Sequence, residues 1–335
     1  MPELYASDRG QALAFVRMTS PTPRRGADRL IDRLYGGLVP GREPARASLL
    51  HRQRPPSRNG WVLETWRVEV GAPVWVGWAL QLLRPESGPP APVLLTGDAC
   101  WGHPDDTVKA GAVAAGVALA WFNRVELAHD APDGARAGPV FERHPGARFG
   151  ALSVWAWGCS RSVDALLQAP GIDPARVAVV GHSRGGKAAL LAGATDARIA
   201  LTVAHNSGAG GAAASHRLGP GAESLAALAA GFPHWLATDI GQSLQTGALD
   251  SLDQHLLLAG IAPRRLLLIQ ARGDAWANPE GVSVVAQRAR AAWRRAWAAD
   301  GFALRWRDGG HPMGLDDWAA AIDAASAPPR HGSRG

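Results

Sequence analysis

The feature that most constrains the fold is one segment near the middle of the chain, Val177-Ala-Val-Val-Gly-His-Ser-Arg-Gly-Gly-Lys. It begins as a short β-branched run, predicted as a strand over 176–180, and continues into a helical pattern over 185–194. The glycines on either side of Ser183 allow a sharp, strained turn that lifts the serine hydroxyl clear of the sheet. Ser183 is therefore a candidate nucleophile, and the backbone N–H of Arg184 a candidate oxyanion donor. A serine in an ordinary turn is the plainer alternative.

Short apolar strands and helical patterns alternate along most of the remaining sequence. We expect further strands at 61–70, 74–83, 92–96, 117–122, 199–205, 265–271 and 303–307, and further helices at 27–35, 151–168, 279–299 and 316–325. Such alternation predicts parallel strands with helices on both faces of the sheet. The 335 residues are 47% hydrophobic, enough for one large core. The sequence thus predicts an α/β protein with the α/β-hydrolase fold, a mostly parallel central sheet in a three-layer αβα sandwich.

A nucleophilic serine needs a histidine that takes its proton, and in this fold that histidine comes late in the chain. The candidates after the serine are His205, His216, His234, His255 and His311. His311 directly follows the last predicted strand, and active sites of such sheets lie at the carboxyl ends of the strands. His255 lies inside an apolar helical pattern and is expected to be structural. We therefore predict His311 as the base.

The acid that orients the base should lie between the serine and the histidine in the sequence. Asp274 follows the predicted strand at 265–271, which places it at the same edge of the sheet as His311. Asp250 and Asp253 lie on a helical approach and are expected at the surface. We therefore predict Asp274 as the acid.

The first 58 residues differ from the rest in charge. Ten arginines lie between Arg17 and Arg58 against three acidic residues, giving this segment +7 where the whole chain carries +6. A basic segment can bind nucleic acid or an acidic polymer, but this one lacks the interleaved aromatic residues of a nucleic-acid platform. We expect an Arg/Pro-rich N-terminal extension over 1–58, packed on the domain or partly loose. One catalytic domain over 59–328 and a flexible tail over 329–335 complete the predicted organisation.

Cysteine usage, apolar run length and lysine usage each narrow the kinds of protein and site that the sequence allows. Cys100 and Cys159 give neither a disulfide framework nor a zinc-ligand pattern, and we expect two buried thiols rather than a bridge. No apolar run approaches the roughly 18–20 residues of a membrane span, and the N-terminus lacks the apolar core of a signal peptide. Only Lys109 and Lys187 are lysines among 35 basic residues. A lysine retained inside the nucleophile motif suggests that arginine does not serve there.

Several short motifs between Trp61 and Trp318 occur together. They are Phe122-Asn-Arg-Val-Glu-Leu-Ala, Trp155-Ala-Trp-Gly, Gly181-His-Ser-Arg-Gly-Gly-Lys, Asn206-Ser-Gly-Ala-Gly-Gly-Ala, Phe232-Pro-His-Trp, Asp274-Ala-Trp-Ala-Asn-Pro and Gly310-His-Pro-Met. This set resembles the bacterial glucuronoyl esterases of carbohydrate esterase family 15. The resemblance implies a serine esterase that cleaves the ester between a glucuronic acid of xylan, often 4-O-methylated, and a lignin alcohol. It also implies that no metal or cofactor is needed.

The resemblance assigns roles to individual residues. Ser183 would be the nucleophile and His311 the base, and the Arg184 side chain would help its backbone hold the oxyanion. Substrate-binding residues would be Lys187, Glu223, Trp276, His234 and Trp235. Many family members carry the triad glutamate just before the Ser-Gly-x-Gly-Gly run. Here that position is Asn206, which cannot be an anion, so the role of the acid falls to Asp274, as in other bacterial members.

The substrate-binding assignments have plainer alternatives. Lys187 could be an ordinary residue on a helix surface, and Glu223 could cap or solvate a helix start. Trp276 could pack in the core, since the chain has 14 tryptophans. His234 and Trp235 could either line the cleft or pack beneath it.

Two other functions compete with the leading one. The first is another carbohydrate esterase, such as an acetyl xylan esterase, and the second is a non-catalytic polysaccharide-binding homologue. The resemblance favours a secreted or periplasmic monomer acting on a glucuronate ester of xylan and lignin, with neither nucleic acid nor membrane as partner.

Overall fold

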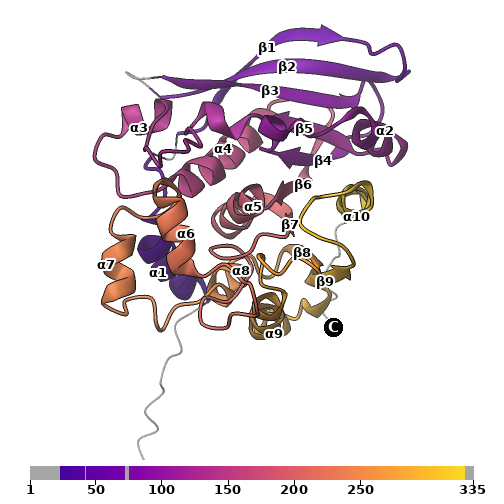
Figure 1. The fold of residues 1–335 in the computed structure, drawn as a ribbon. Helices are drawn as coiled ribbons and strands as arrows, with labels where there is room; N and C mark the ends of the chain where they lie inside the picture. Colours follow the sequence, from indigo (N-terminus) through magenta and orange to yellow (C-terminus); the bar gives the residue numbers. More distant parts are fainter. Residues whose placement is uncertain (1–22, 42, 72–74, 329–335) are drawn as a thin grey trace, which may run out of the picture.

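The computed structural model describes residues 23–41, 43–71 and 75–328. Its strands form one sheet in the order β1-β2-β3-β5-β4-β6-β7-β8-β9 (Figure 1). The strands are β1 (Arg46–Gln53), β2 (Trp61–Val70), β3 (Val76–Pro85), β4 (Ala91–Thr96), β5 (Ala118–Phe122), β6 (Ile172–His182), β7 (Ile199–His205), β8 (Arg265–Ala271) and β9 (Phe302–Arg307). Neighbours from β1 to β5 pair antiparallel, and those from β5 across to β9 pair parallel. The predicted, mostly parallel sheet is confirmed.

Helices cover both faces of the sheet. One face carries α1 (Pro23–Tyr35), α4 (Ala151–Leu166), α5 (Arg184–Thr195), α8 (His255–Ala259) and α9 (Pro279–Arg295), and the other carries α2 (Asp106–Ala114) and α10 (Leu315–Ser326). Three short helices lie in connections: α3 (Pro139–Arg143), α6 (Leu225–Gly231) and α7 (Ile240–Gln245). The result is the expected three-layer sandwich, and none of the described helices is long and apolar enough to cross a membrane.

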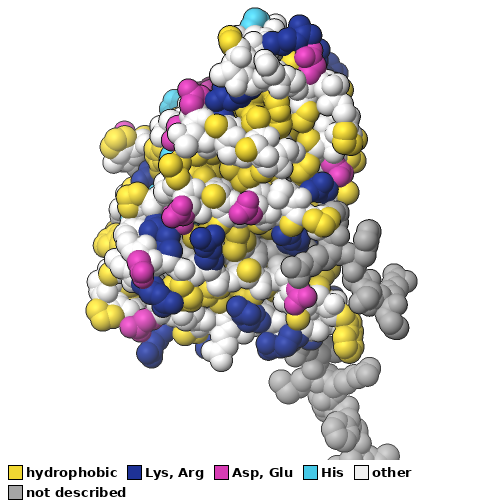
Figure 2. Space-filling model, turned by 90° about the vertical axis from the view of Figure 1, so that its right-hand side faces the viewer, with side chains coloured by type: hydrophobic (Ala, Val, Ile, Leu, Met, Phe, Trp, Pro, Cys, Tyr) yellow, Lys and Arg dark blue, Asp and Glu magenta, His cyan; other side chains and the backbone are white. Residues whose placement is uncertain are grey.

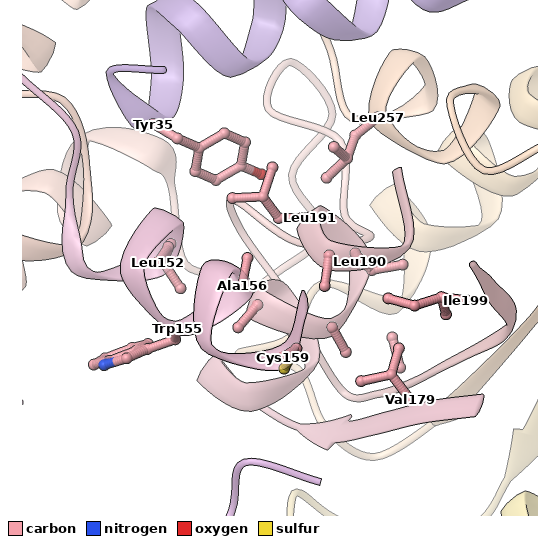
Figure 3. Close-up of a cluster of buried hydrophobic side chains, with 14 of the residues drawn as sticks. Tyr35, Leu152, Trp155, Ala156, Cys159, Val179, Leu190, Leu191, Ile199 and Leu257 are labelled. Carbon is pink, nitrogen blue, oxygen red and sulfur yellow. The ribbon is translucent and has the colours of Figure 1, made fainter. Parts of the chain in front are cut away.

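The larger core cluster lies between the sheet and the α4/α5 layer. Figure 3 shows buried side chains of this cluster from four elements, among them Tyr35 of α1, Trp155 of α4, Leu190 of α5 and Val179 of β6. All four side chains are at most 1% exposed, and a fully buried apolar side chain of this size contributes about 1.5–3 kcal/mol. Packing on both sides of β6 therefore fixes the strand that leads to Ser183.

The sequence pattern did not predict β1, and two side chains lie elsewhere than expected. Most side chains of β1 are exposed, so this edge strand lacks the alternation that marks a half-buried strand. Residues 23–58 of the expected extension supply α1 and β1 to the same core and sheet; 1–22 and the expected tail over 329–335 lie outside the described residues.

Asp253 is buried rather than exposed, and its carboxylate accepts the backbone N–H of Ser215 at 2.9 Å. Both cysteines are free, and Cys100 is only half-buried.

Charge on the visible surface is mixed rather than concentrated. On the side of the molecule shown in Figure 2, basic and acidic side chains are interspersed, with hydrophobic side chains between them. That side therefore offers no continuous basic stripe of the kind that tracks a nucleic-acid backbone.

Candidate active site

Ser183 lies in a strained turn between β6 and α5. Its φ and ψ are 53° and −117°, and its N–H donates to His205 O at 2.9 Å. A Cβ on Gly181 would come within 2.1 Å of Gly185 O, and a Cβ on Gly185 within 2.1 Å of Asp98 Oδ1. Only glycine fits both positions, so the Gly-x-Ser-x-Gly pattern is a packing requirement. The predicted strand–turn–helix geometry is confirmed; strain of this kind, of order 1–3 kcal/mol, is typical of functional sites.

A buried ion pair supports this turn from below. Asp98 accepts the backbone N–H of His182 at 2.8 Å and pairs with Arg124, and both charged side chains are 1% exposed. The Arg124 guanidinium lies 4.4 Å from the Trp101 ring centroid and 5.1 Å from that of Trp155. The sequence pattern did not predict this support. Its one signal in the sequence was the presence of Arg124 in the motif Phe122-Asn-Arg-Val-Glu-Leu-Ala.

His311 and Asp274 meet at the carboxyl edge of the sheet. His311 Nδ1 lies 2.6 Å from Asp274 Oδ2, and the two side chains are 40% and 4% exposed. A carboxylate at Nδ1 holds the proton on that nitrogen, which leaves Nε2 free to accept a proton from an attacking hydroxyl. Within the described residues the Ser183 hydroxyl has no hydrogen-bond partner, as is common for catalytic groups without substrate.

Asn206 occupies the position where the resemblance would have placed a triad glutamate. It follows β7, and its Nδ2 donates to His311 O at 3.0 Å while its Oδ1 accepts the N–H of Ala271 at 2.8 Å. The amide therefore binds backbone groups on both sides rather than the His311 ring. Its role is to join the end of β8 to the loop that carries the histidine.

The Arg184 side chain lies in a cluster of aromatic rings. Its guanidinium forms an ion pair with Asp130 and lies 4.6 Å from the Trp235 ring centroid. Asp130 also accepts hydrogen bonds from Trp235 Nε1 at 2.8 Å and His234 Nε2 at 3.3 Å. Burial opposes ionisation of Asp130, but hydrogen bonds from His234 and Arg184 outweigh it and hold its pKa well below the usual range. Arg184 is thus fixed beside the nucleophile.

His234 and Trp235 contribute through this cluster. They are 1% and 3% exposed, and the Trp235 ring stacks on Phe232 at a centroid distance of 3.9 Å. Of the two alternatives from the sequence, these positions favour packing beneath the site. Their contact with the site runs through Asp130 and Arg184.

Lys187 and Glu223 form a buried pair near the nucleophile. Lys187 Nζ donates to Ser207 O at 2.7 Å and to Ala209 O, and lies 4.0 Å from Glu223 Oε2. Each side chain is 5% exposed. Burial lowers the pKa of Lys187 to about 8, against the opposing effect of the Glu223 charge. Burial also raises the pKa of Glu223, which the Lys187 charge partly offsets.

Three alternatives are excluded by these positions. Lys187 is not a surface residue. Glu223 is not a helix cap, since Ser224 caps α6 by accepting the N–H of Ala227. Trp276 is not in the core, because it is 56% exposed. The Trp276 carbonyl accepts the Glu223 N–H at 3.1 Å. The exposed indole is therefore joined through the backbone to the buried Lys187–Glu223 pair.

The arrangement as a whole suits acyl transfer. A serine in an elbow, a histidine–carboxylate pair and a fixed cation lie at one sheet edge. In the described part of the chain no cluster of three or more His, Cys, Asp or Glu side chains could hold a metal ion.

Comparisons with known proteins agree with this geometry. A family model described as "Glucuronyl esterase, fungi" matches residues 78–296. The chain is 36% identical over 193 residues to carbohydrate esterase MZ0003 from an unknown prokaryotic organism, covering 53% of this chain and 44% of that protein. It is 35% identical over 195 residues to the 4-O-methyl-glucuronoyl methylesterase of Hypocrea jecorina, covering 56% and 42%.

A solved structure shares the fold over most of its length. The glucuronoyl esterase from Solibacter usitatus superposes with a TM-score of 0.78 and 26% identity, covering 90% of this chain and 91% of that one. By contrast, the matched part spans less than half the length of the two curated relatives. The α/β-hydrolase fold and the resemblance expected from the motifs are both confirmed. Since the family model matches more than half of the chain, this protein belongs to the glucuronyl esterase family.

Proposed function

We propose that this protein is a serine esterase that hydrolyses esters of glucuronic acid, with Ser183 as nucleophile. The observation that carries the proposal is the 2.6 Å contact between His311 Nδ1 and Asp274 Oδ2 at the sheet edge where Ser183 forms the elbow. The printed names of curated relatives, 4-O-methyl-glucuronoyl methylesterase among them, support the substrate class.

The reaction follows from the positions of these groups. Ser183 Oγ attacks the ester carbonyl carbon while His311 Nε2 takes its proton, and the oxyanion is held by the Arg184 N–H. The imidazolium, stabilised by Asp274, then gives the proton to the alcohol oxygen as the C–O bond breaks. Water attacks the acyl-enzyme in the same way and releases the uronic acid and Ser183.

The acid part of the substrate belongs on the Lys187–Glu223 side. A buried ammonium beside a carboxylate provides both donor and acceptor for sugar hydroxyls, and the exposed Trp276 ring provides a surface on which a sugar face can stack. In xylan the same site would take a glucuronate, with or without 4-O-methylation, esterified to a lignin alcohol.

A direct test uses the purified protein and the methyl ester of 4-O-methyl-glucuronate. We expect catalytic release of methanol and the free uronic acid in equal amounts, well above buffer alone. If neither product appears while the protein is folded by circular dichroism, the proposed function is wrong.

A further inference from the structure

The loop that carries His311 is held by Asn206 from one side and by an arginine at the end of β9 from the other. Arg307 NH2 donates to Gly310 O at 2.8 Å and to Pro312 O at 2.6 Å, the carbonyls that immediately flank His311. Arg307 NH1 donates to Asp308 O at 2.8 Å. One planar guanidinium therefore contacts the loop on both sides of the histidine, which its fixed fork of donors makes possible.

Asp317 on α10 holds the arginine and the far end of the loop. Its Oδ2 lies 3.1 Å from Arg307 Nε and accepts the N–H of Gly314 at 2.9 Å. The Asp317 side chain is 4% exposed. Burial opposes its ionisation, but hydrogen bonds from His205 and the Gly314 N–H outweigh this and lower its pKa. The carboxylate is thus charged and opposite the guanidinium.

Two buried histidines connect this pair to the nucleophile side. His205 Nε2 lies 3.2 Å from both Asp317 Oδ2 and Arg307 NH2, and its Nδ1 lies 2.9 Å from His182 Nδ1. The His182 ring, adjacent to Ser183 in the chain, has its centroid 4.8 Å from that of His311. The arginine–aspartate pair therefore reaches His311 twice, through the loop backbone and through the His182 ring.

We propose that Arg307, paired with Asp317, is a positioning residue for His311. The reason is conformational: the loop contains Gly309, with φ of 91°, and Gly310, and both residues are exposed. Two glycines before a half-exposed histidine leave many backbone states open unless side chains select one. A displacement of about 1 Å in a catalytic group can reduce the rate about 10²-fold. This inference rests on the proposed function, since it assigns His311 as the base.

The test compares Arg307→Met, Arg307→Lys and the matched control Arg305→Met on one glucuronate ester. Arg305 is exposed on the same strand and lies outside the site. We expect Arg307→Met to lower kcat about 10- to 100-fold with KM changed less than about threefold, because the defect lies in orientation rather than binding. Arg307→Lys should remain low, since one ammonium cannot bridge the flanking carbonyls. Arg305→Met should match the wild type.

Chemical rescue by guanidinium distinguishes a loss of His311 positioning from a general loss of structure. Added guanidinium chloride, at concentrations that leave the wild type folded, should restore part of kcat in Arg307→Ala and do nothing for His311→Ala. Wild-type kcat in folded Arg307→Met, full activity in Arg307→Lys, or no rescue of folded Arg307→Ala would each overturn the proposal.

Two further arms keep the test decisive. If the Arg307 variants do not fold, Asp317→Asn takes their place, since it removes the carboxylate charge and keeps an acceptor for Gly314. We expect the same fall in kcat, and unchanged kcat overturns the proposal. Normal turnover by His311→Ala would instead show that His311 is not the base, whereas the proposed function itself is wrong only if the wild type does not hydrolyse the ester.

Discussion

The two halves of the site are built in opposite ways. In the hydrolytic half, His311 is 40% exposed and stands on a glycine-containing loop held by side chains. In the half proposed to bind the sugar, Lys187 and Glu223 are each 5% exposed, and the ammonium is already bonded to backbone carbonyls. The hydrolytic half must exchange protons with substrate and water, so its base stays accessible. In the other half, burial fixes the position of the Lys187 ammonium, although it also lowers the pKa of that group to about 8.

Ser183→Ala should abolish ester hydrolysis on every substrate. The triad acts as a unit, so kcat should fall by about 10³-fold or more. Steady-state rates and circular dichroism of the same preparation measure this. Activity within tenfold of the wild type would remove Ser183 as the nucleophile.

Asp274→Asn should impair hydrolysis nearly as much. Without the carboxylate, the imidazolium loses its stabilising charge and Nδ1 its fixed proton, and kcat should drop about 10²–10⁴-fold. Asn206→Asp is the informative companion, since it introduces a carboxylate at the family's alternative position. Full activity of Asp274→Asn, with no further gain when Asn206→Asp is added to it, would show that the assignment of the acid is wrong.

Arg124→Met should destabilise the elbow through its buried support. It leaves the Asp98 carboxylate uncompensated beneath His182, and breaking such a buried pair lowers the free energy of unfolding by about 3–5 kcal/mol. Urea denaturation gives this value. Arg54→Met breaks an exposed pair with Glu86 and should leave stability nearly unchanged. Equal effects of the two variants would show that the buried pair is not a special support.

Lys187→Ala should separate the two halves by substrate. For glucuronate esters the activation free energy that corresponds to kcat/KM should rise by about 1–3 kcal/mol, the range for a lost charged hydrogen-bond donor. For a small acetyl ester, which does not reach the sugar side, it should barely change. Equal losses on both substrates would place Lys187 in the support of the fold or the oxyanion instead.

The pH dependence should show the smallest effect. Because burial lowers the pKa of Lys187 to about 8, its charge is present below that pH and lost above it. KM for a glucuronate ester should therefore rise about two- to fivefold through pH 8, as expected when a hydrogen bond loses its charge. Lys187→Met should remove this step, and a step of the same size in that variant would assign it to another group.

The sequence predicted the hydrolytic half better than its supports. Ser183, Asp274 and His311 each follow a strand of the parallel part of the sheet, so the strand pattern alone places them at one edge. Asp98 and Arg307 were missed because their roles depend on contacts with distant segments, which carry no periodic or spacing signal. The burial of Lys187 was equally invisible, since a helix position one turn beyond the nucleophile is compatible with either the surface or the interior.

The most direct test of the central claim is the ratio of kcat/KM for two esters that share one alcohol. The benzyl ester of glucuronic acid and benzyl acetate place the same leaving group on Ser183 and differ only in the acid that meets Lys187, Glu223 and Trp276. We predict a preference for the glucuronate ester of about 10²-fold or more, as several sugar contacts of about 1–1.5 kcal/mol would give. Equal rates, or faster cleavage of benzyl acetate, would contradict a site built for glucuronic acid.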